Sequence, residues 1–255
     1  MEERSHRAVP VERHFAEGAL NIVRFNWPFF AWCAVCAAIL LIVALCASSW
    51  IASMALVGLV FLLLGVMVPL LVSFYVYDLA GLYQLSFLNG LSPRKVVNLT
   101  AGFDETTGIL LEKFSDAELV TFDFYQAQTH TEPSIRRARK RHPGVACTLS
   151  ITTSNIPVPD GDIDLILAFL SLHEIRDADE RARFLTEVRR TLSSCGNLII
   201  VEHLRDLPNF LAYSIGFLHF HSRQTWHQAF RRAGLVVSYE ETLTPFIRLF
   251  KLTRP

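Results

Sequence analysis

The chain has 255 residues, enough for one or two domains, and its 24 Lys and Arg balance its 24 Asp and Glu. This balance argues against nucleic-acid binding through a general positive field. Apolar residues make up 51% of the chain but are unevenly distributed, because residues 25–77 contain no Asp, Glu, Lys or Arg. The five cysteines show no spacing typical of a disulfide framework or a zinc ribbon, which fits a reducing, cytosolic setting for the polar part of the chain.

The uncharged stretch predicts a transmembrane hairpin. One helix needs about 20 residues to cross a bilayer, so two crossings fit, predicted at residues 28–47 and 53–77 with a short turn around Ser48, Ser49 and Trp50. A signal peptide does not fit, since the apolar region is too long and starts too late. A pair of buried core helices is the remaining alternative.

Basic residues on both sides of the hairpin predict its orientation. Arginines at 4, 7, 13 and 24 precede the first crossing, Arg94 and Lys95 follow the second, and the turn has no basic residue. By the positive-inside rule, both termini and the polar part of the chain are expected in the cytoplasm. The predicted location is therefore the cell membrane, as a multi-pass protein in contact with membrane lipids.

Beyond residue 78, helical and strand patterns alternate. We expect strands at 95–99, 119–122, 145–151, 164–170, 197–202, 235–242 and 246–253, and helices at 78–91, 106–114, 134–142, 178–192 and 223–233. The predicted organisation is a cytoplasmic segment (1–27), a hairpin (28–77), a linker helix (78–94) and a catalytic domain (95–255). Alternating elements favour an α/β fold with a doubly wound, mostly parallel sheet that ends in an antiparallel pair. Ligands bind such sheets at the carboxyl ends of the strands.

A carboxylate follows the second predicted strand, in a position suited to a nucleoside. Asp123 comes 21 residues after Gly102, which lies in the loop after the first strand. A carboxylate at this position can accept hydrogen bonds from both ribose hydroxyls of an adenosine held over the first loop. The alternative is a loop aspartate that only caps the next turn.

Three segments in order resemble a known family. These are residues 156–164 (IPVPDGDID), Leu172-His173-Glu174, and residues 187–192 (EVRRTL) followed by Gly196. From about Val96 to the C-terminus the chain resembles the class I S-adenosylmethionine-dependent methyltransferases. The resemblance implies a seven-stranded Rossmann-like sheet, methyltransferase activity and S-adenosyl-L-methionine as cofactor.

The resemblance also implies where the cofactor binds. Its methionine part would face Asn98, Thr100, Gly102 and Asp104, its ribose Asp123, its adenine Thr152 and Thr153, and its sulfonium Phe169. The family usually has an acid at position 98 and glycines at 100 and 104, so this loop approaches a ligand less easily. Two alternatives therefore stay open: metal-assisted amino transfer to a membrane quinone, as in rhodoquinone-forming relatives, or a non-catalytic membrane scaffold with a degenerate fold.

Ionisable residues gather near the predicted strand ends and are the candidate catalytic groups: His173, Glu174, His203, His219 and His221. Three roles are open for the histidines. One is a general base, since the imidazole pKa lies near 6.5; another is metal binding, with His219 and His221 flanking Phe220; the third is hydrogen bonding that holds loops. No residue is assigned to a metal.

The apolar segment 208–220 lies between the fifth strand and the next helix, where it is expected to cover the active site. Next to a membrane anchor, such a cover favours a lipophilic small-molecule acceptor, although the segment could simply pack on the sheet or touch the bilayer. The sequence thus predicts a membrane-anchored methyltransferase of a lipophilic acceptor. It indicates neither the acceptor nor the oligomeric state.

Overall fold

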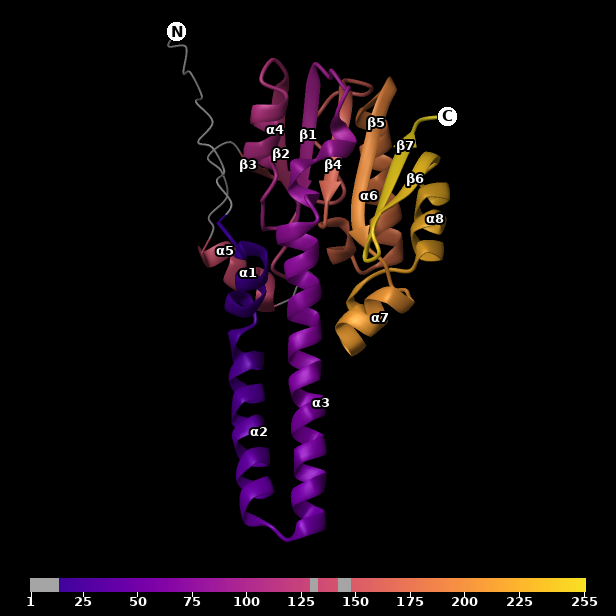
Figure 1. Ribbon diagram of the computed structural model, residues 1–255. Helices are drawn as coiled ribbons and strands as arrows, with labels where there is room; N and C mark the ends of the chain where they lie inside the picture. The colour runs from indigo at the N-terminus through magenta and orange to yellow at the C-terminus, as the bar shows by residue number, and fades with distance from the viewer. Residues whose placement is uncertain (1–13, 129–132, 142–147) are drawn as a thin grey trace.

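The computed structural model describes residues 14–128, 133–141 and 148–255 (Figure 1). Its N-terminal part consists of α1 (Glu17–Phe25), α2 (Trp27–Cys46) and α3 (Ser49–Phe74). By length and composition, α2 and the stretch that begins with α3 could each cross a membrane. The arginines at 4, 7 and 13 lie outside the described residues. No residue of α2 is fully buried, so much of its apolar surface faces outward although the helix packs against α3.

The linker predicted as a helix at 78–91 is instead a series of tight turns, and that prediction was wrong. Helix α3 runs into a π-turn, η1 (Tyr75–Leu79), followed by two 3₁₀ turns, η2 (Leu82–Gln84) and η3 (Ser86–Leu88). Gly81 and Leu85 have positive φ values of 67° and 46°, and they separate the three turns from one another. Apolar residues three apart suit 3₁₀ turns as well as an α-helix, so the pattern could not distinguish them.

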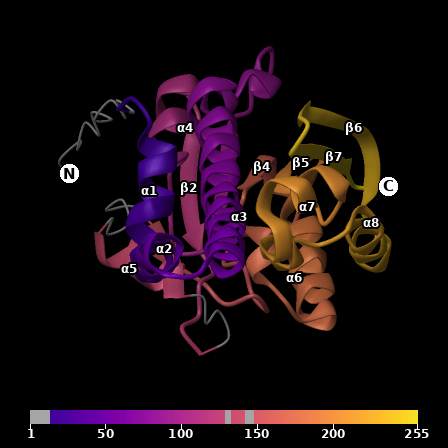
Figure 2. The same cartoon turned by 60° about the horizontal axis from the view of Figure 1, so that its bottom comes forward.

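A seven-stranded sheet forms the rest of the molecule (Figures 1 and 2). Its strands are β1 (Lys95–Thr100), β2 (Glu118–Asp123), β3 (Thr148–Ser150), β4 (Ile163–Phe169), β5 (Leu192–His203), β6 (Val236–Thr244) and β7 (Ile247–Thr253). The order is β3-β2-β1-β4-β5-β7-β6, and β7 runs antiparallel to both of its neighbours. The predicted doubly wound sheet with an antiparallel edge is confirmed, with the switch point between β1 and β4.

Each face of the sheet has its own hydrophobic core. Helices α6 (Ala178–Thr191) and α8 (Arg223–Arg232) cover one face, with Phe184 and Trp226 fully buried. The turns η1–η3 and helix α4 (Thr107–Lys113) cover the other, with Leu85 and Leu110 fully buried. The linker is therefore a covering layer of the α/β domain rather than a spacer, and it fixes the end of α3 to the sheet.

The parallel strands end on the side from which the hairpin extends (Figure 1). At this junction lie α1, helix α5 (Pro133–Arg141), and the apolar segment after β5, which forms α7 (Leu207–Tyr213) and the 3₁₀ turn η5 (Ser214–His219). Helix α1 was not predicted. The carboxylate of Asp78 accepts hydrogen bonds from the backbone N–H groups of Gly18 (2.8 Å) and Ala19 (3.0 Å), which caps α1 from the far end of the hairpin.

Candidate functional site

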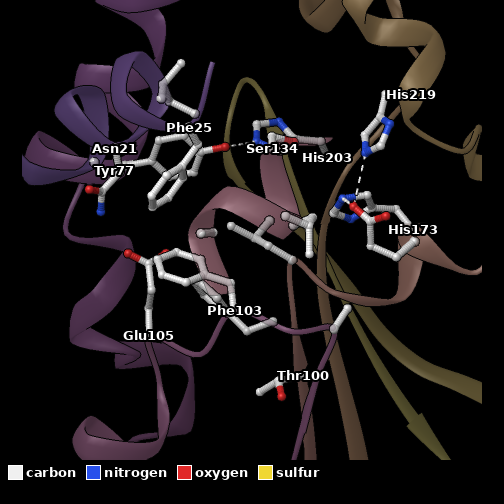
Figure 3. A pocket seen from close by; sticks show the side chains of 18 of the residues that line it. Asn21, Phe25, Tyr77, Thr100, Phe103, Glu105, Ser134, His173, His203 and His219 are labelled. Carbon is white, nitrogen blue, oxygen red and sulfur yellow. Dashed lines mark hydrogen bonds and ion pairs between the residues drawn. The ribbon is translucent and has the colours of Figure 1, made fainter. Parts of the chain in front are cut away.

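A cavity of about 230 Å³ lies at the carboxyl ends of β1, β4 and β5 (Figure 3). Its floor comes from the loops after β1 and β4, and its far wall from α1, η1 and α5. The candidate residues that line it are Thr100, Phe169, His173, Glu174, His203 and His219. The sequence patterns thus converge on one cavity, because parallel strands end at a common edge.

Two residues expected at the cofactor hold the first loop instead. The fully buried Asn98 amide donates to the hydroxyls of Thr106 and Thr107, at 2.9 Å each, and to Asp104 Oδ1 at 3.2 Å. Asp104 Oδ1 also accepts the backbone N–H groups of Thr106 and Thr107, both at 3.0 Å. This network ties β1 to the start of α4, and the direct contact of Asn98 and Asp104 with a cofactor stays a prediction.

Asp123 is nine-tenths buried at the end of β2, but its carboxylate is already paired with an arginine. Its Oδ2 is paired with the guanidinium of Arg139 from α5, and its Oδ1 accepts the backbone N–H of Tyr125 at 2.9 Å. Gly102 has a φ of 89°, and the space beside its α-carbon is filled by Arg139 and Tyr125. A nucleoside at this position has to displace the guanidinium.

The remaining expected cofactor residues differ in their access to the cavity. Thr153 is buried and donates to Glu180 Oε1 at 2.6 Å, while Thr152 is exposed and contacts Ser154. Phe169 lines the cavity, and its ring packs on Tyr83 with centroids 5.2 Å apart. The cavity is therefore continuous with the first loop and β4, whereas the two threonines lie outside its lining.

One end of this cavity fits a sulfonium amino acid. Glu105 lines it and accepts the hydroxyl hydrogen of Tyr83 at 2.6 Å. A carboxylate suits an α-ammonium group, and the rings of Tyr83 and Phe169 offer π faces that attract a cation. The residues present thus match the two positive charges of the methionine end of S-adenosylmethionine, the α-ammonium and the sulfonium.

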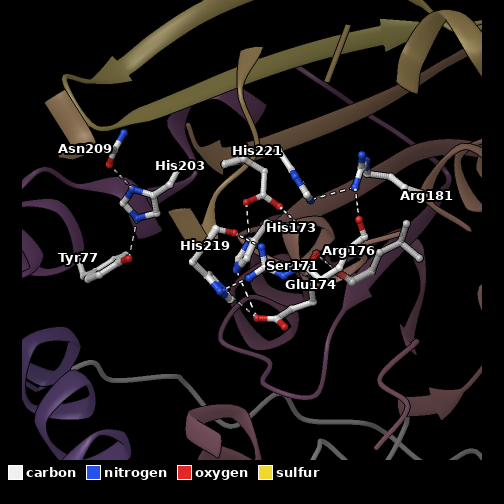
Figure 4. A network of polar contacts seen from close by, with 12 residues as sticks. Tyr77, Ser171, His173, Glu174, Arg176, Arg181, His203, Asn209, His219 and His221 are labelled. Carbon is white, nitrogen blue, oxygen red and sulfur yellow. Dashed lines mark hydrogen bonds and ion pairs between the residues drawn. The ribbon is translucent and has the colours of Figure 1, made fainter. Parts of the chain in front are cut away.

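A cluster of carboxylates and imidazoles forms the opposite wall (Figure 4). His173 Nδ1 donates to Glu202 Oε2 at 2.7 Å, and His173 Nε2 lies 3.5 Å from Glu174 Oε1. His219 Nε2 lies 3.4 Å from the same Glu174 oxygen, and Arg176 contacts the other ring nitrogen of His219. Glu202 is fully buried, and Glu174 nearly so.

Electrostatics within this cluster favour its charged forms. Burial by itself lowers the pKa of His173, but the carboxylates of Glu202 and Glu174 outweigh it and raise that pKa to about 10. Burial also opposes ionisation of Glu174, yet hydrogen bonds from His173 and His219 hold its pKa well below the ordinary range. His173 is therefore a bound cation at neutral pH and is unsuited to act as a general base.

His203 sits in a second hydrogen-bonded chain that determines its tautomer. The Asn209 amide nitrogen donates to Asp206 and to the Phe246 carbonyl, so its oxygen accepts His203 Nδ1–H at 3.0 Å. His203 Nε2 is then the acceptor for the Tyr77 hydroxyl at 2.7 Å. Burial lowers the pKa of His203 to about 4, so the ring is neutral and both Tyr77 and His203 face the cavity.

His221 does not join the cluster. Its Nε2 lies 3.0 Å from the Arg181 guanidinium, and burial beside that cation lowers its pKa to about 3. His219 and His221 therefore point to different partners, and a chelate made by these two side chains, which the sequence left open, is not formed.

Several residues of the cavity were missed from the sequence. Asn21 and Phe25 come from α1, Tyr77 from η1, and Tyr83 and Glu105 from the linker and first loop. A tyrosine at the end of an apolar helix suggests an interfacial anchor rather than a site residue. Glu105 was the one residue that the sequence could have indicated, because it is a carboxylate in the loop after the first strand.

The comparisons with known proteins agree with this geometry. Residues 98–200 match the family model described as a methyltransferase domain. The PH0226 protein of Pyrococcus horikoshii OT3 aligns with a TM-score of 0.51 and 15% identity over 69% of this chain and 88% of that one. A SAM-dependent methyltransferase of Aquifex aeolicus aligns with a TM-score of 0.48 and 17% identity over 69% and 93%. A search of curated protein sequences finds no match.

The match begins at β1 and ends within β5, so it spans the loops that form the floor of the cavity. The seven-stranded order with an antiparallel edge, the cavity at the carboxyl ends and the family match all point to one activity. Residues 98–200 are therefore a methyltransferase domain, and the chain is an enzyme of that type with S-adenosylmethionine as its cofactor.

Proposed function

We propose that this methyltransferase is anchored in the membrane by α2 and α3, with both termini in the cytoplasm, and that it methylates a lipophilic small molecule carrying an acidic hydroxyl. One observation carries the proposal: the cavity is walled by both ends of the hairpin, through Asn21 and Phe25 before α2 and Tyr77 after α3. A molecule dissolved in the bilayer would reach the cavity where the hairpin that anchors the enzyme joins the α/β domain.

The surface beside α3 supports an apolar acceptor. Leu207, Leu211 and Ile215 of α7 and η5 are all more than two-thirds exposed, beside α3. A soluble protein rarely leaves such a patch open unless a partner or membrane covers it. The outward-facing rings and aliphatic side chains of α2 extend the same apolar surface, as expected for a membrane interface.

The cofactor supplies a methyl group bound to a positively charged sulfur. For its methionine end we propose Thr100 and Glu105, with Phe169 beside the sulfonium. For its nucleoside we propose Asp123 once Arg139 has moved, and Thr152 and Thr153 near the adenine. Gly102 is the position where the backbone can approach a ligand, because its φ is positive.

Activation of the acceptor falls to Tyr77 and His203. The Tyr77 hydrogen points to His203 Nε2, which leaves its oxygen lone pairs free to accept a proton from the acceptor hydroxyl. As the bond to the methyl group forms, the acceptor oxygen becomes strongly acidic, so its proton passes to Tyr77 and the Tyr77 proton passes to His203, even though the pKa of His203 is only about 4. The Asn209 oxygen stabilises the resulting imidazolium through Nδ1–H.

The test uses full-length protein in lipid nanodiscs with cofactor carrying a radiolabelled methyl group. Label should enter the organic extract of the membrane, and Tyr77→Phe should lower the rate by about 10²–10⁴-fold while S-adenosylhomocysteine binding stays unchanged. Tyr75→Phe is the matched control, because Tyr75 does not line the cavity. Label that appears only in water-soluble products, or a Tyr77→Phe enzyme with full activity, contradicts the proposal.

A further inference from the structure

The strongest unassigned feature is the pairing of two imidazoles with one carboxylate on the cavity wall. His173, Glu174 and His219 each offer one ligand atom, and these atoms all lie within 4.8 Å of one another. We infer that this cluster is a binding site for a divalent transition-metal ion, with zinc as its expected occupant. The inference rests on the proposed function only for the role given to the ion.

The distances between the ligand atoms are close to those expected in a tetrahedral metal site. His173 Nε2 and His219 Nε2 lie 3.5 and 3.4 Å from Glu174 Oε1. Zinc–nitrogen and zinc–oxygen bonds of about 2.0–2.1 Å in a tetrahedron place neighbouring ligand atoms about 3.3–3.4 Å apart. Two of the three edges are thus already close to the required length, and the third needs a small rotation of the His219 side chain.

The groups behind the ligands also fit. Glu202 accepts the Nδ1 proton of His173 at 2.7 Å and the His173 backbone N–H at 3.2 Å, which aims Nε2 at Glu174. Metal-bound histidines commonly donate their other ring N–H to a carboxylate in this way. The ion has to displace the Nε2 proton that His173 carries at neutral pH, and the two buried carboxylates of Glu174 and Glu202 then balance the charge of the divalent ion.

Two histidines and one carboxylate are the protein ligands of several catalytic zinc sites, which keep a further position open. Here all three ligands line the cavity that is proposed to hold the acceptor. An ion at this place would bind the acceptor oxygen and favour its deprotonated form. It would therefore orient the acceptor hydroxyl between the cluster and Tyr77.

Arg176 is expected to weaken metal binding, which provides a specific test. Its guanidinium contacts His219 Nδ1 and the His219 carbonyl from the protein surface. Coordination through Nε2 requires a proton on Nδ1, so the guanidinium has to leave. Removing it should strengthen metal binding, an effect that a merely structural cluster would not produce.

The experiment is zinc titration of chelator-treated, full-length protein in detergent against a fluorescent zinc chelator, with elemental analysis of the bound metal. We expect one zinc ion per chain, at least 100-fold weaker binding in His219→Ala, 10- to 100-fold weaker binding in Glu202→Gln, and tighter binding in Arg176→Gln. His227→Ala is the control, since His227 contacts Glu240 at 3.1 Å without a second imidazole ligand.

Absence of stoichiometric zinc from wild-type protein, or equal affinity in His219→Ala, overturns the inference. Binding of S-adenosylhomocysteine, measured in the same samples, shows that each variant is folded. Metal content is measured without any acceptor, so its failure leaves methyl transfer to a lipophilic acceptor untouched. Conversely, if the protein binds zinc but transfers no radiolabel to the membrane extract, only the proposed function is contradicted.

Discussion

Gly18 offers the sharpest test of how the hairpin shapes the site. A β-carbon at position 18 would overlap the β-carbon of Tyr77 well inside 3.0 Å. Because unstrained carbon–carbon contacts are about 3.5–4.0 Å, Gly18→Ala has to move Tyr77 or α1 by about 1 Å. The Tyr77 hydroxyl lies 2.7 Å from His203 Nε2, so a shift of this size taken up by Tyr77 breaks the hydrogen bond.

A displacement of about 1 Å at a positioning group costs up to about 10²-fold in rate, equivalent to about 2.7 kcal/mol in the activation barrier. We expect this loss in the radiolabel assay, with S-adenosylhomocysteine affinity unchanged because the first loop is not touched. Overpacking typically costs about 1–3 kcal/mol of stability, which the better helix propensity of alanine offsets by about 1 kcal/mol. The melting temperature should therefore fall modestly.

Gly65→Ala is the matched control, because nothing lies within 4 Å of a β-carbon built there. It should leave activity unchanged. If Gly18→Ala is as active as Gly65→Ala, Tyr77 does not act from the position it holds in this structure, and the proposed activation of the acceptor is wrong.

Two further predictions concern the cofactor and pH. Arg139→Gln should tighten S-adenosylhomocysteine binding about fivefold in calorimetry, since a partly exposed ion pair to Asp123 contributes about 1 kcal/mol. Arg141→Gln, on the exposed surface of the same helix, should have no effect, and weaker binding in Arg139→Gln would mean that the guanidinium contacts the cofactor. Burial holds the folded-state pKa of His203 near 4, so its contribution to stability is complete above about pH 6.5 and is lost as the pH falls towards 4, by about 3 kcal/mol. Chemical denaturation at stepped pH should show a shallower slope in His203→Gln, and an unchanged slope would contradict a neutral buried imidazole.

The sequence predicted the location of the cavity, but it did not predict the hydrogen-bond partners of several residues near it. Asn98 lies near the end of the first strand and Asp104 follows that strand, as the family pattern requires, yet their side chains bond to each other and to the start of α4. A spacing pattern reports where a residue falls along the chain, whereas its hydrogen-bond partner depends on neighbours distant in sequence. The same limit explains why His219 and His221, two residues apart, face different partners.

The linker shows a different limit. Leu82, Leu85 and Leu88 are buried, and their spacing of three residues suits both a 3₁₀ turn and an α-helix. Only the sheet decides between them, because a rigid helix of that length would not follow its surface. The consequence reaches the site, since this segment positions Tyr77 and Tyr83 at the cavity.

By itself, the sequence determined the two long apolar helices, the alternation of strands and helices, the resemblance to methyltransferases and the edge of the sheet where the cavity lies. These follow from local periodicity and composition, which each segment carries on its own. The tertiary structure decided that α1 and Tyr77 close the cavity, that Arg139 occupies Asp123, and that Glu202 holds His173. Each of these contacts joins residues far apart in the chain, and their free energies depend on burial and distance that no single segment encodes.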